Sequence, residues 1–377
     1  MPAALPLDGE GQGGGAGRRR TQAVLLPPIP TFPRQGGRSM LQHISDRSLC
    51  MHYRTLGQTG LQVSEVGLGA MPFGGMVTRP DGTQFGWSGT DDQELIALVH
   101  RSEELGVNLL DTAAAYGNGH GEAVVGEALQ GRRDRWIVAT KVNPNQGIDA
   151  DTPDEAAVHK RITESCEQSL HRLQTDYIDI YQLHAIPYPW AMSSAMRTLA
   201  VLRDAGKIRW YGISTNNRGA IEQLRAYGPL HVLQIGYNML ERQADALLHW
   251  ARAENIGTLI RVPLAKGMLT GKYSGPQAVA MPPGDHRYER FQQPHTADGL
   301  QKLPQLGFLQ TPTRSLVQAA LRFVLDHPGV TSVIAGAKTR QQIDENTSAS
   351  ALPSLAPDEC TRALAIADTI GTPNWSR

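Results

Sequence analysis

The sequence predicts an α/β protein in which eight parallel strands close into a barrel, with a helix after each strand. Apolar segments rich in Val, Ile and Leu recur along the chain without strict alternation, which is typical of strands buried on both faces. Segments with helical periodicity separate them. Because these strand–helix units follow one another in a single series, a closed (β/α)8 barrel, the TIM-barrel architecture, is favoured over an open sheet.

The strands and helices can be placed by residue range. Strands are expected at 65–71, 107–111, 135–141, 176–184, 207–214, 231–237, 257–264 and 330–337. Helices are expected at 91–105, 119–130, 153–173, 190–206, 217–227, 240–255, 312–327 and 339–351. The first helix begins at Thr90 or Asp91, and Glu94 is placed to complete a capping box.

Two Rossmann-like halves are the alternative architecture. That fold carries Gly-x-Gly-x-x-Gly directly after its first strand. The glycines of GLGAMPFGG at 67–75 have other spacings, which argues against it.

The chain is expected to divide into a disordered extension at 1–50 and a barrel domain at 51–377. The extension holds eight Gly, six Pro and three consecutive arginines, so it cannot bury enough apolar surface to offset the entropy of ordering. We interpret it as an upstream extension with Met51 as the functional start; a basic interaction arm or an import peptide are alternatives. After Met51, YRTLG and LQV flank Gln58-Thr59-Gly60, which predicts an N-terminal β-hairpin able to plug the bottom of the barrel.

The composition excludes several classes of partner. Lys plus Arg is 36 and Asp plus Glu is 36, so no net field favours nucleic acid or an anionic membrane. The three cysteines are widely separated without CxxC spacing, which fits a reducing, cytoplasmic environment. No apolar run approaches the roughly 20 residues needed to span a bilayer.

Four polar residues lie at or just after predicted strands: Asp111, Tyr116, Lys141 and His184. In a parallel barrel the carboxyl ends of the strands share one rim, where barrel enzymes carry their chemistry. Each residue taken alone has a structural interpretation, such as rim packing, a solvated lysine or a core histidine. Together they suggest a proton donor with a tuned pKa. A metal-assisted hydrolase is a weaker alternative, because His184 is the only histidine that ends a predicted strand, and no metal site is expected.

The chain closely resembles the aldo-keto reductase superfamily, including its bacterial NADPH-dependent members, over about 53–350. The matching stretches are LGQTGLQVSEVGLGAMPFGG, NLLDTAAAYGNGHGEAVVGEAL, IVATKV, LHRLQTDYIDIYQLH, GKIRWYGIST, QIGYN, PLAKGMLTGKY and VIAGAKTRQQIDEN. The resemblance implies a (β/α)8 barrel that binds a nicotinamide cofactor, usually NADPH, without a Rossmann domain. It also implies reduction of aldehydes or ketones to alcohols, or the reverse.

The resemblance implies Tyr116 as the general acid, Lys141 and Asp111 as the groups that tune it, and His184 as the residue that orients the substrate carbonyl. Elementary chemistry supports these roles. A free tyrosine has a pKa of about 10, and a nearby ammonium lowers it by stabilising the phenolate. A buried lysine needs an anionic partner such as Asp111 to stay charged. Histidine can donate a hydrogen bond to the carbonyl oxygen.

The cofactor contacts implied by the resemblance follow strands five to eight: Ser214, Asn216, Gln234, Arg261, Pro263, Leu264, Gly267, Leu269, Lys272, Gly336, Ala337, Lys338, Gln342 and Asn346. Two positions depart from the family pattern. Thr215 occupies the usual Asn position, so either Asn216 reaches the carboxamide or that contact is altered. Arg261 stands where many members place an aromatic ring against the nicotinamide; a guanidinium can lie flat on a ring, but it adds charge and calls for a carboxylate that the sequence does not identify.

NADPH is expected rather than NADH. Lys338 and, more weakly, Arg340 lie at a predicted helix start, which suits the 2′-phosphate. Lys272 would neutralise the pyrophosphate, which the glycines of the preceding loop let the backbone approach. Gln342 and Asn346 lie one helical turn apart and resemble the family's adenosine contacts.

The substrate is the least determined part. Candidate pocket walls are Met71, Phe73, Phe85, Trp87, His120, Tyr188, Trp190 and Tyr237, which suit hydrophobic or sugar-like carbonyl compounds. The insertion 77–90 is expected to border the pocket, the segment 265–311 to act as a lid, and Asp285-His286-Arg287 to anchor that loop. The alternative function is a regulatory NADPH-binding protein with slow turnover, like the channel-associated β-subunits of the superfamily. The natural substrate, the reaction direction and the oligomeric state are left open.

Overall fold

The eight expected strands form the closed barrel. The computed structural model describes residues 51–78, 81–272, 285, 287–288 and 294–370, so the expectation for 1–50 lies outside the described residues. The parallel strands are β3 (Val66–Gly69), β6 (Leu109–Asp111), β7 (Ile137–Val142), β8 (Ile178–Leu183), β9 (Ile208–Ser214), β10 (Val232–Gly236), β11 (Gly257–Arg261) and β12 (Ser332–Gly336). They close in the order β10-β11-β12-β3-β6-β7-β8-β9, which confirms the predicted fold class.

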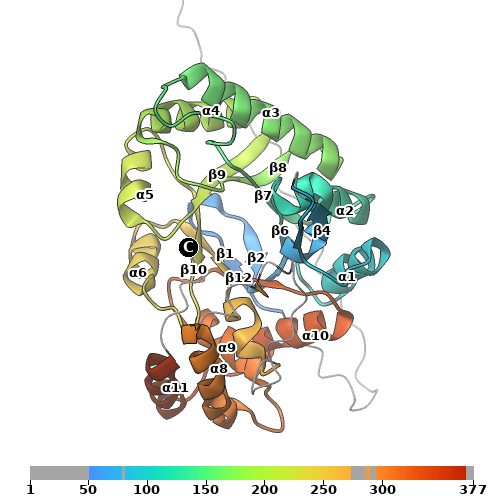
Figure 1. Ribbon diagram of the computed structural model, residues 1–377, viewed down its shortest axis with the longest axis vertical. Helices are drawn as coiled ribbons and strands as arrows, with labels where there is room; N and C mark the ends of the chain where they lie inside the picture. The colour runs from blue at the N-terminus through green and yellow to red at the C-terminus, as the bar shows by residue number, and fades with distance from the viewer. Residues whose placement is uncertain (1–50, 79–80, 273–284, 286, 289–293, 371–377) are drawn as a thin grey trace, which may run out of the picture. The chain divides into compact units, whose positions relative to one another are not determined.

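A ring of helices surrounds the barrel (Figure 1). They are α1 (Asp92–Glu104), α2 (His120–Ala128), α3 (Glu155–Leu173), α4 (Met192–Asp204), α5 (Arg218–Arg225), α6 (Asp245–Ala253), α9 (Leu316–Leu325) and α10 (Arg340–Ser348). Each lies within a predicted helix. The Asp91 carboxylate caps α1 by accepting from Glu94 N at 3.1 Å, and Ser315 with Gln318 forms a complete capping box on α9.

The N-terminal hairpin plugs the barrel, as expected. It consists of β1 (Tyr53–Thr55) and β2 (Gln62–Ser64), paired antiparallel. Leu56 and Val63 are fully buried against inward side chains of barrel strands, including Leu109, Ile180 and Leu259. Burial of these apolar groups therefore holds the hairpin and the barrel interior together.

Several elements were not predicted. The insertion at 77–90 includes a small hairpin, β4 (Met76–Thr78) and β5 (Gln84–Gly86). Helix α8 (Pro294–Lys302) and the 3-10 segment Leu303–Leu309 pack against a C-terminal helix, α11 (Pro357–Ile370), and together with α9 they form a second apolar core. Since 294–309 is anchored in this core, the prediction that 265–311 acts as a lid is wrong for that part. Residues 273–284 of the segment lie outside the described residues.

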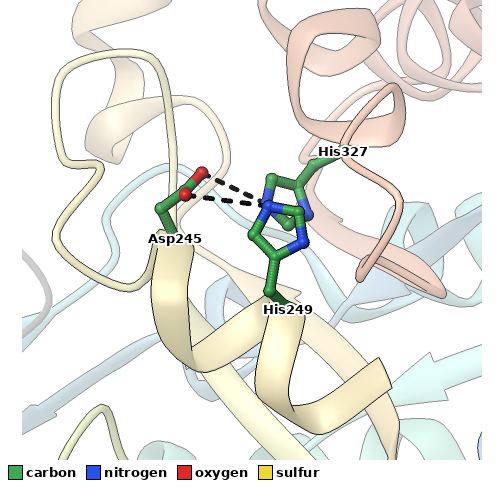
Figure 2. Close-up of side chains that lie close together, drawn as sticks. All are labelled: Asp245, His249 and His327. Atoms are coloured by element: carbon green, nitrogen blue, oxygen red, sulfur yellow. Dashed lines mark hydrogen bonds and ion pairs between the residues drawn. The ribbon is translucent and has the colours of Figure 1, made fainter. Parts of the chain in front are cut away.

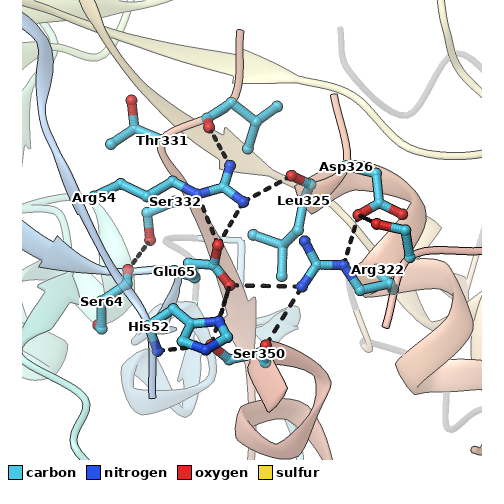
Figure 3. Close-up of polar contacts among 12 residues, drawn as sticks. His52, Arg54, Ser64, Glu65, Arg322, Leu325, Asp326, Thr331, Ser332 and Ser350 are labelled. Carbon is cyan, nitrogen blue, oxygen red and sulfur yellow. Dashed lines mark hydrogen bonds and ion pairs between the residues drawn. The ribbon is translucent and has the colours of Figure 1, made fainter. Parts of the chain in front are cut away.

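A buried ion-pair network ties the hairpin to the far end of the chain (Figure 3). The Glu65 side chain is almost fully buried; its Oε1 accepts from Arg54 Nε at 2.7 Å and its Oε2 from Ser350 Oγ at 3.0 Å. Arg322 lies 3.6 Å from the same carboxylate. Arg54 also donates to the carbonyl oxygens of Val330 and Leu325, at 2.7 and 2.9 Å. This network therefore joins the start of the chain's barrel domain to α9 and the approach to β12.

No helix within the described residues is both long and apolar enough to cross a bilayer.

Replacing Glu65 with Gln should lower the free energy of unfolding by about 3 kcal/mol, because two arginines lose their buried carboxylate. The measurement is equilibrium urea unfolding. Glu155→Gln is the matched control: it breaks an exposed pair with Arg197, where the side chains are 52% and 61% exposed. We expect a loss of no more than about 1 kcal/mol there. Equal losses in the two variants would contradict the role of the buried network.

Candidate active site

The carboxyl ends of the barrel strands surround a cavity of about 1160 Å³. Asp111, Tyr116 and His184 line it, and the fully buried Lys141 lies directly against two of them. The four residues come from β6, the loop after β6, β7 and the end of β8. The rim expected from the sequence is therefore formed, and it brings the predicted catalytic residues together.

The centre of this group is a buried lysine. Lys141 Nζ donates to Asp111 Oδ1 at 2.6 Å, to the Thr112 carbonyl oxygen at 2.8 Å and to the Tyr116 hydroxyl at 3.2 Å. These three acceptors account for all three protons of the ammonium. Burial opposes the charge on Lys141, but attraction to Asp111 and Tyr116 outweighs it and raises the lysine pKa. Lys141 is therefore a fixed cation at the phenol.

The tyrosine differs from the sequence expectation. Burial raises the pKa of Tyr116 above its ordinary value, and the lowering by Lys141 does not offset this. Asp111 adds to the rise because its negative charge disfavours a phenolate, while Arg261 acts in the opposite direction. In this structure Tyr116 is thus a protonated phenol at neutral pH. The expectation of a lowered pKa neglected the cost of removing a phenolate from water.

His184 lies beside the phenol and is held neutral. Its ring meets the Tyr116 ring edge-on, with centroids 6.0 Å apart. Burial, followed by repulsion from Lys141 and Arg261, lowers the pKa of His184 to about 3. A neutral imidazole carries one N–H and can donate a hydrogen bond without carrying a charge.

The residues after β9 and β10 are engaged with the protein itself. Gln234 Nε2 donates to Asp111 Oδ2 at 2.7 Å, and Gln234 Oε1 accepts from Ser214 Oγ at 3.1 Å. Gln234 therefore positions Asp111, a role that the sequence did not indicate. Asn216 bonds both the N–H and the carbonyl of Gly236, each at 2.8 Å. These bonds tie Asn216 to β10, and the residue also lines the cavity, so a contact from its remaining amide N–H or lone pair to the carboxamide stays a prediction.

Arg261, at the end of β11, lines the cavity. Burial lowers its pKa, and attraction to Tyr116 and Glu241 opposes that change. Glu241, itself 1% exposed, is the carboxylate that the sequence did not identify. Two residues here were missed because they carry no motif: Glu241 and Asn238, whose amide Nδ2 donates to Glu241 Oε2 at 3.2 Å and to the Val262 carbonyl at 3.1 Å.

The loop after β11 has an unusual backbone. Val262, Ala265 and Lys266 have φ values of 52°, 48° and 54°, in the left-handed region that non-glycine residues rarely adopt. Such backbone occurs where surrounding contacts hold it, and it clusters at ligand sites. Pro263, Leu264, Gly267 and Lys272 line the cavity as predicted. Leu269 does not; its side chain is buried in the second core.

Several cations converge at the far end of the cavity. Lys338, Arg287, Lys272 and Lys266 all line it. Lys338 Nζ lies 4.8 Å from the centre of the Trp87 ring and the Arg287 guanidinium carbon 4.4 Å from it. Burial lowers the pKa of Lys338, and repulsion from Arg287 and Lys272 adds to this. Cations that repel one another in a cavity are suited to an anion such as a phosphate.

The remaining predicted cofactor residues also reach this end. Gly336, Ala337, Gln342 and Asn346 line the cavity. Gln342 Oε1 accepts from the Lys338 backbone N–H at 2.7 Å, so it orders the loop before α10. Arg287 was predicted only as a loop anchor; its paired bonds to Asp285, both at 2.9 Å, agree with that, but its guanidinium also faces the cavity wall at Trp87.

Of the candidate substrate walls, Met71 and Trp87 line the cavity. Four others do not. Phe73 and Tyr237 are buried in the main core, Trp190 bonds the Ala150 carbonyl through Nε1, and His120 pairs with Asp92. Tyr188 packs against Trp190 and is likewise outside the lining. The Phe85 side chain lies outside the described residues. Phe73 and Tyr237 lie in the core rather than at the cavity because burial of their large apolar surface is favourable.

One cluster of potential metal ligands lies away from the cavity: Asp245 and His249 on α6, and His327 after α9 (Figure 2). Gly329 N–H donates to His327 Nδ1 at 3.0 Å. Nδ1 is therefore unprotonated, and Nε2 carries the proton that it shares with Asp245 Oδ1 at 3.2 Å. A metal on Nε2 would need the opposite arrangement, with Nδ1 as the donor. The cluster is an Asp–His hydrogen bond that holds α6 beside the end of α9.

Comparison with known proteins agrees with this geometry. The model of the aldo/keto reductase family matches residues 65–368. Aldo-keto reductase YhdN from Bacillus subtilis is 34% identical over 303 residues, covering 78% of this chain and 87% of its own. The NADH-specific methylglyoxal reductase from Escherichia coli is 29% identical over 311 residues, which cover 78% of this chain and 92% of the reductase. The structure of aldo-keto reductase AKR11C1 from Bacillus halodurans in its holo form superposes with a TM-score of 0.65 at 29% identity, covering 84% of this chain and 96% of that one.

This chain belongs to the aldo/keto reductase family. It is therefore an NAD(P)-dependent oxidoreductase, as the resemblance predicted.

His184 should remain neutral from about pH 5 to pH 8. The pKa of His184 falls from 6.5 in the unfolded chain to about 3 in the folded one. As the pH falls below 6.5, the unfolded chain therefore takes up a proton that the folded protein does not, and the free energy of unfolding decreases. NMR of the histidine rings, with His184→Gln to assign the signal, measures this. A His184 resonance that titrates near 6.5 would contradict the lowered pKa.

Proposed function

We propose that this protein is an NADPH-dependent carbonyl reductase with Tyr116 as the proton donor. The observation that carries the proposal is the 3.2 Å contact between Lys141 Nζ and the Tyr116 hydroxyl at the cavity wall. It joins a protonated phenol to a fixed cation, and the His184 ring meets the same phenol edge-on. A carbonyl oxygen placed against both side chains would meet two hydrogen-bond donors.

The residues would act in one sequence. NADPH, when bound, supplies the hydride that reaches the carbonyl carbon. As negative charge grows on the carbonyl oxygen, Tyr116 transfers its proton to that oxygen, and the product is the alcohol. Lys141 stabilises the phenolate left behind, which lowers the barrier to that transfer. His184 donates to the same oxygen as a neutral imidazole, and Asp111 keeps Lys141 charged. Oxidation of an alcohol is the reverse of these steps.

The cations around Trp87 support NADPH as the cofactor. The 2′-phosphate distinguishes NADPH from NADH, and Lys338 with Arg287 offers two positive groups at the cavity end that a phosphate would bridge. One relative is named NADH-specific, so nucleotide preference varies among the proteins this chain resembles. We therefore attribute a preference for NADPH in this chain to Lys338 and Arg287.

Tyr116→Phe should lower kcat for aldehyde reduction by about 100- to 10,000-fold while NADPH still binds, because only the proton donor is lost. Steady-state turnover on a panel of aldehydes, with cofactor binding followed by fluorescence, measures both. Tyr177→Phe, a tyrosine that packs against Arg133 and Arg209, is the control. Undiminished turnover in Tyr116→Phe would remove the phenol as the acid. A wild-type protein that binds NADPH but turns over no aldehyde would favour the regulatory alternative.

Lys338→Ala should weaken NADPH binding by about tenfold or more and leave NADH binding nearly unchanged, since one charge-assisted contact to the 2′-phosphate is lost. Titration of both nucleotides by isothermal calorimetry tests this. Lys160→Ala on the exposed face of α3 serves as a charge-matched control. A similar loss for NADH would place Lys338 at a group common to both nucleotides and refute the assignment.

A further inference from the structure

We propose that Arg261, with Glu241 behind it, makes this cavity bind NADPH more tightly than NADP⁺ and so favours the reaction in the direction of carbonyl reduction. The proposal rests on the proposed function, because it takes the nicotinamide to lie beside Tyr116. The oxidised ring carries a positive charge that the reduced ring lacks. A cation fixed at the cavity wall therefore discriminates between the two forms by Coulomb repulsion.

At the catalytic end of the cavity, Arg261 is the cation that a bound nicotinamide ring would meet. Lys141 is neutralised by Asp111 at 2.6 Å and is fully buried below the cavity surface. His184 is a neutral ring, and Tyr116 is a protonated phenol. Arg261 differs from Lys141 because it lines the cavity itself. Its charge reaches the reacting groups, since it contributes to the lowered pKa of His184.

Glu241 is a buried negative charge that acts on Arg261 from outside the cavity lining. The carboxylate is 1% exposed and does not line the cavity, whereas Arg261 does. The pair therefore presents its positive end to the cavity. Glu241 is the carboxylate whose attraction raises the pKa of Arg261 against the effect of burial.

The backbone keeps this arrangement rigid. Asn238 Nδ2 contacts Glu241 Oε2 at 3.2 Å and the carbonyl oxygen of Val262, the residue after Arg261, at 3.1 Å. Asn238 Oδ1 accepts from the Glu241 N–H at 3.0 Å, so the turn that carries the carboxylate is also fixed. Val262 is held at φ 52°, which a β-branched residue adopts only under such constraint. One asparagine thus sets the position of both charged residues.

The fixed position of Arg261 also affects the release of the oxidised cofactor. Arg261 stays where it is when the ring becomes cationic after hydride transfer, so the oxidised cofactor is repelled and leaves faster. Release of cofactor often limits turnover, so faster release of NADP⁺ favours steady-state reduction. The equilibrium constant of the overall reaction is unchanged, because an enzyme does not alter the free energies of the free substrates and products.

The experiment measures dissociation constants of NADPH and NADP⁺ by fluorescence titration for the wild type, Arg261→Gln, Arg261→Lys and Glu241→Gln. In Arg261→Gln the preference for NADPH should fall by about tenfold, equivalent to about 1.4 kcal/mol. Arg261→Lys should retain most of it, since the charge remains. Glu241→Gln should increase it, because the positive charge is no longer offset. Opposite changes from two neutral glutamine substitutions cannot come from general damage to the fold.

Lys338→Ala is the matched control in the same cavity. It should weaken NADPH and NADP⁺ equally, because both carry the 2′-phosphate, and leave their ratio unchanged. A ratio that is the same in Arg261→Gln as in the wild type would overturn the proposal. If Glu241→Gln does not fold, which circular dichroism would reveal, the Gln and Lys variants of Arg261 still decide the result. Wild-type protein that binds neither nucleotide would instead refute the proposed function.

Discussion

The contact between Lys141 and Asp111 is the interaction on which the site depends. A lysine with no exposed surface would lose its charge without a carboxylate at 2.6 Å. Gln234 of β10 donates to that carboxylate, and Ser214 of β9 donates in turn to Gln234, so neighbouring strands support the charge at the phenol. The closed sheet is what makes this possible, because strands remote in sequence become neighbours in a ring.

The tyrosine shows how burial and charge oppose one another. A cationic neighbour alone would make the phenol more acidic, yet burial wins and the group stays protonated in the free protein. That state suits a proton donor for reduction. The cation still matters, because it acts most strongly on the phenolate that appears only after the proton has left.

Charge also divides the cavity into two regions. At one end Lys338 and Arg287 bring two positive charges together at Trp87, and Asp285 pairs with Arg287. At the other end a balanced group surrounds Tyr116, with Arg261 facing inward. A dinucleotide has this same distribution, with its phosphates distant from its nicotinamide. With NADPH bound as proposed, Lys338 and Arg287 would face its 2′-phosphate, and Arg261 would be the cation beside its nicotinamide.

The amino-acid sequence by itself determined the barrel, because buried parallel strands read as apolar runs and each helix carries its own periodicity and caps. It also predicted that Asp111, Tyr116, Lys141 and His184 would lie together, since strand ends of a barrel share a rim. Only the tertiary structure decided which aromatic side chains face the cavity, that Asn216 turns to Gly236, and that Glu241 backs Arg261. The C-terminal helix and the second core were missed for a related reason: their apolar residues make sense only once distant segments pack together. Local pattern fixes an element, but side-chain direction and long-range partners depend on packing that no single segment encodes.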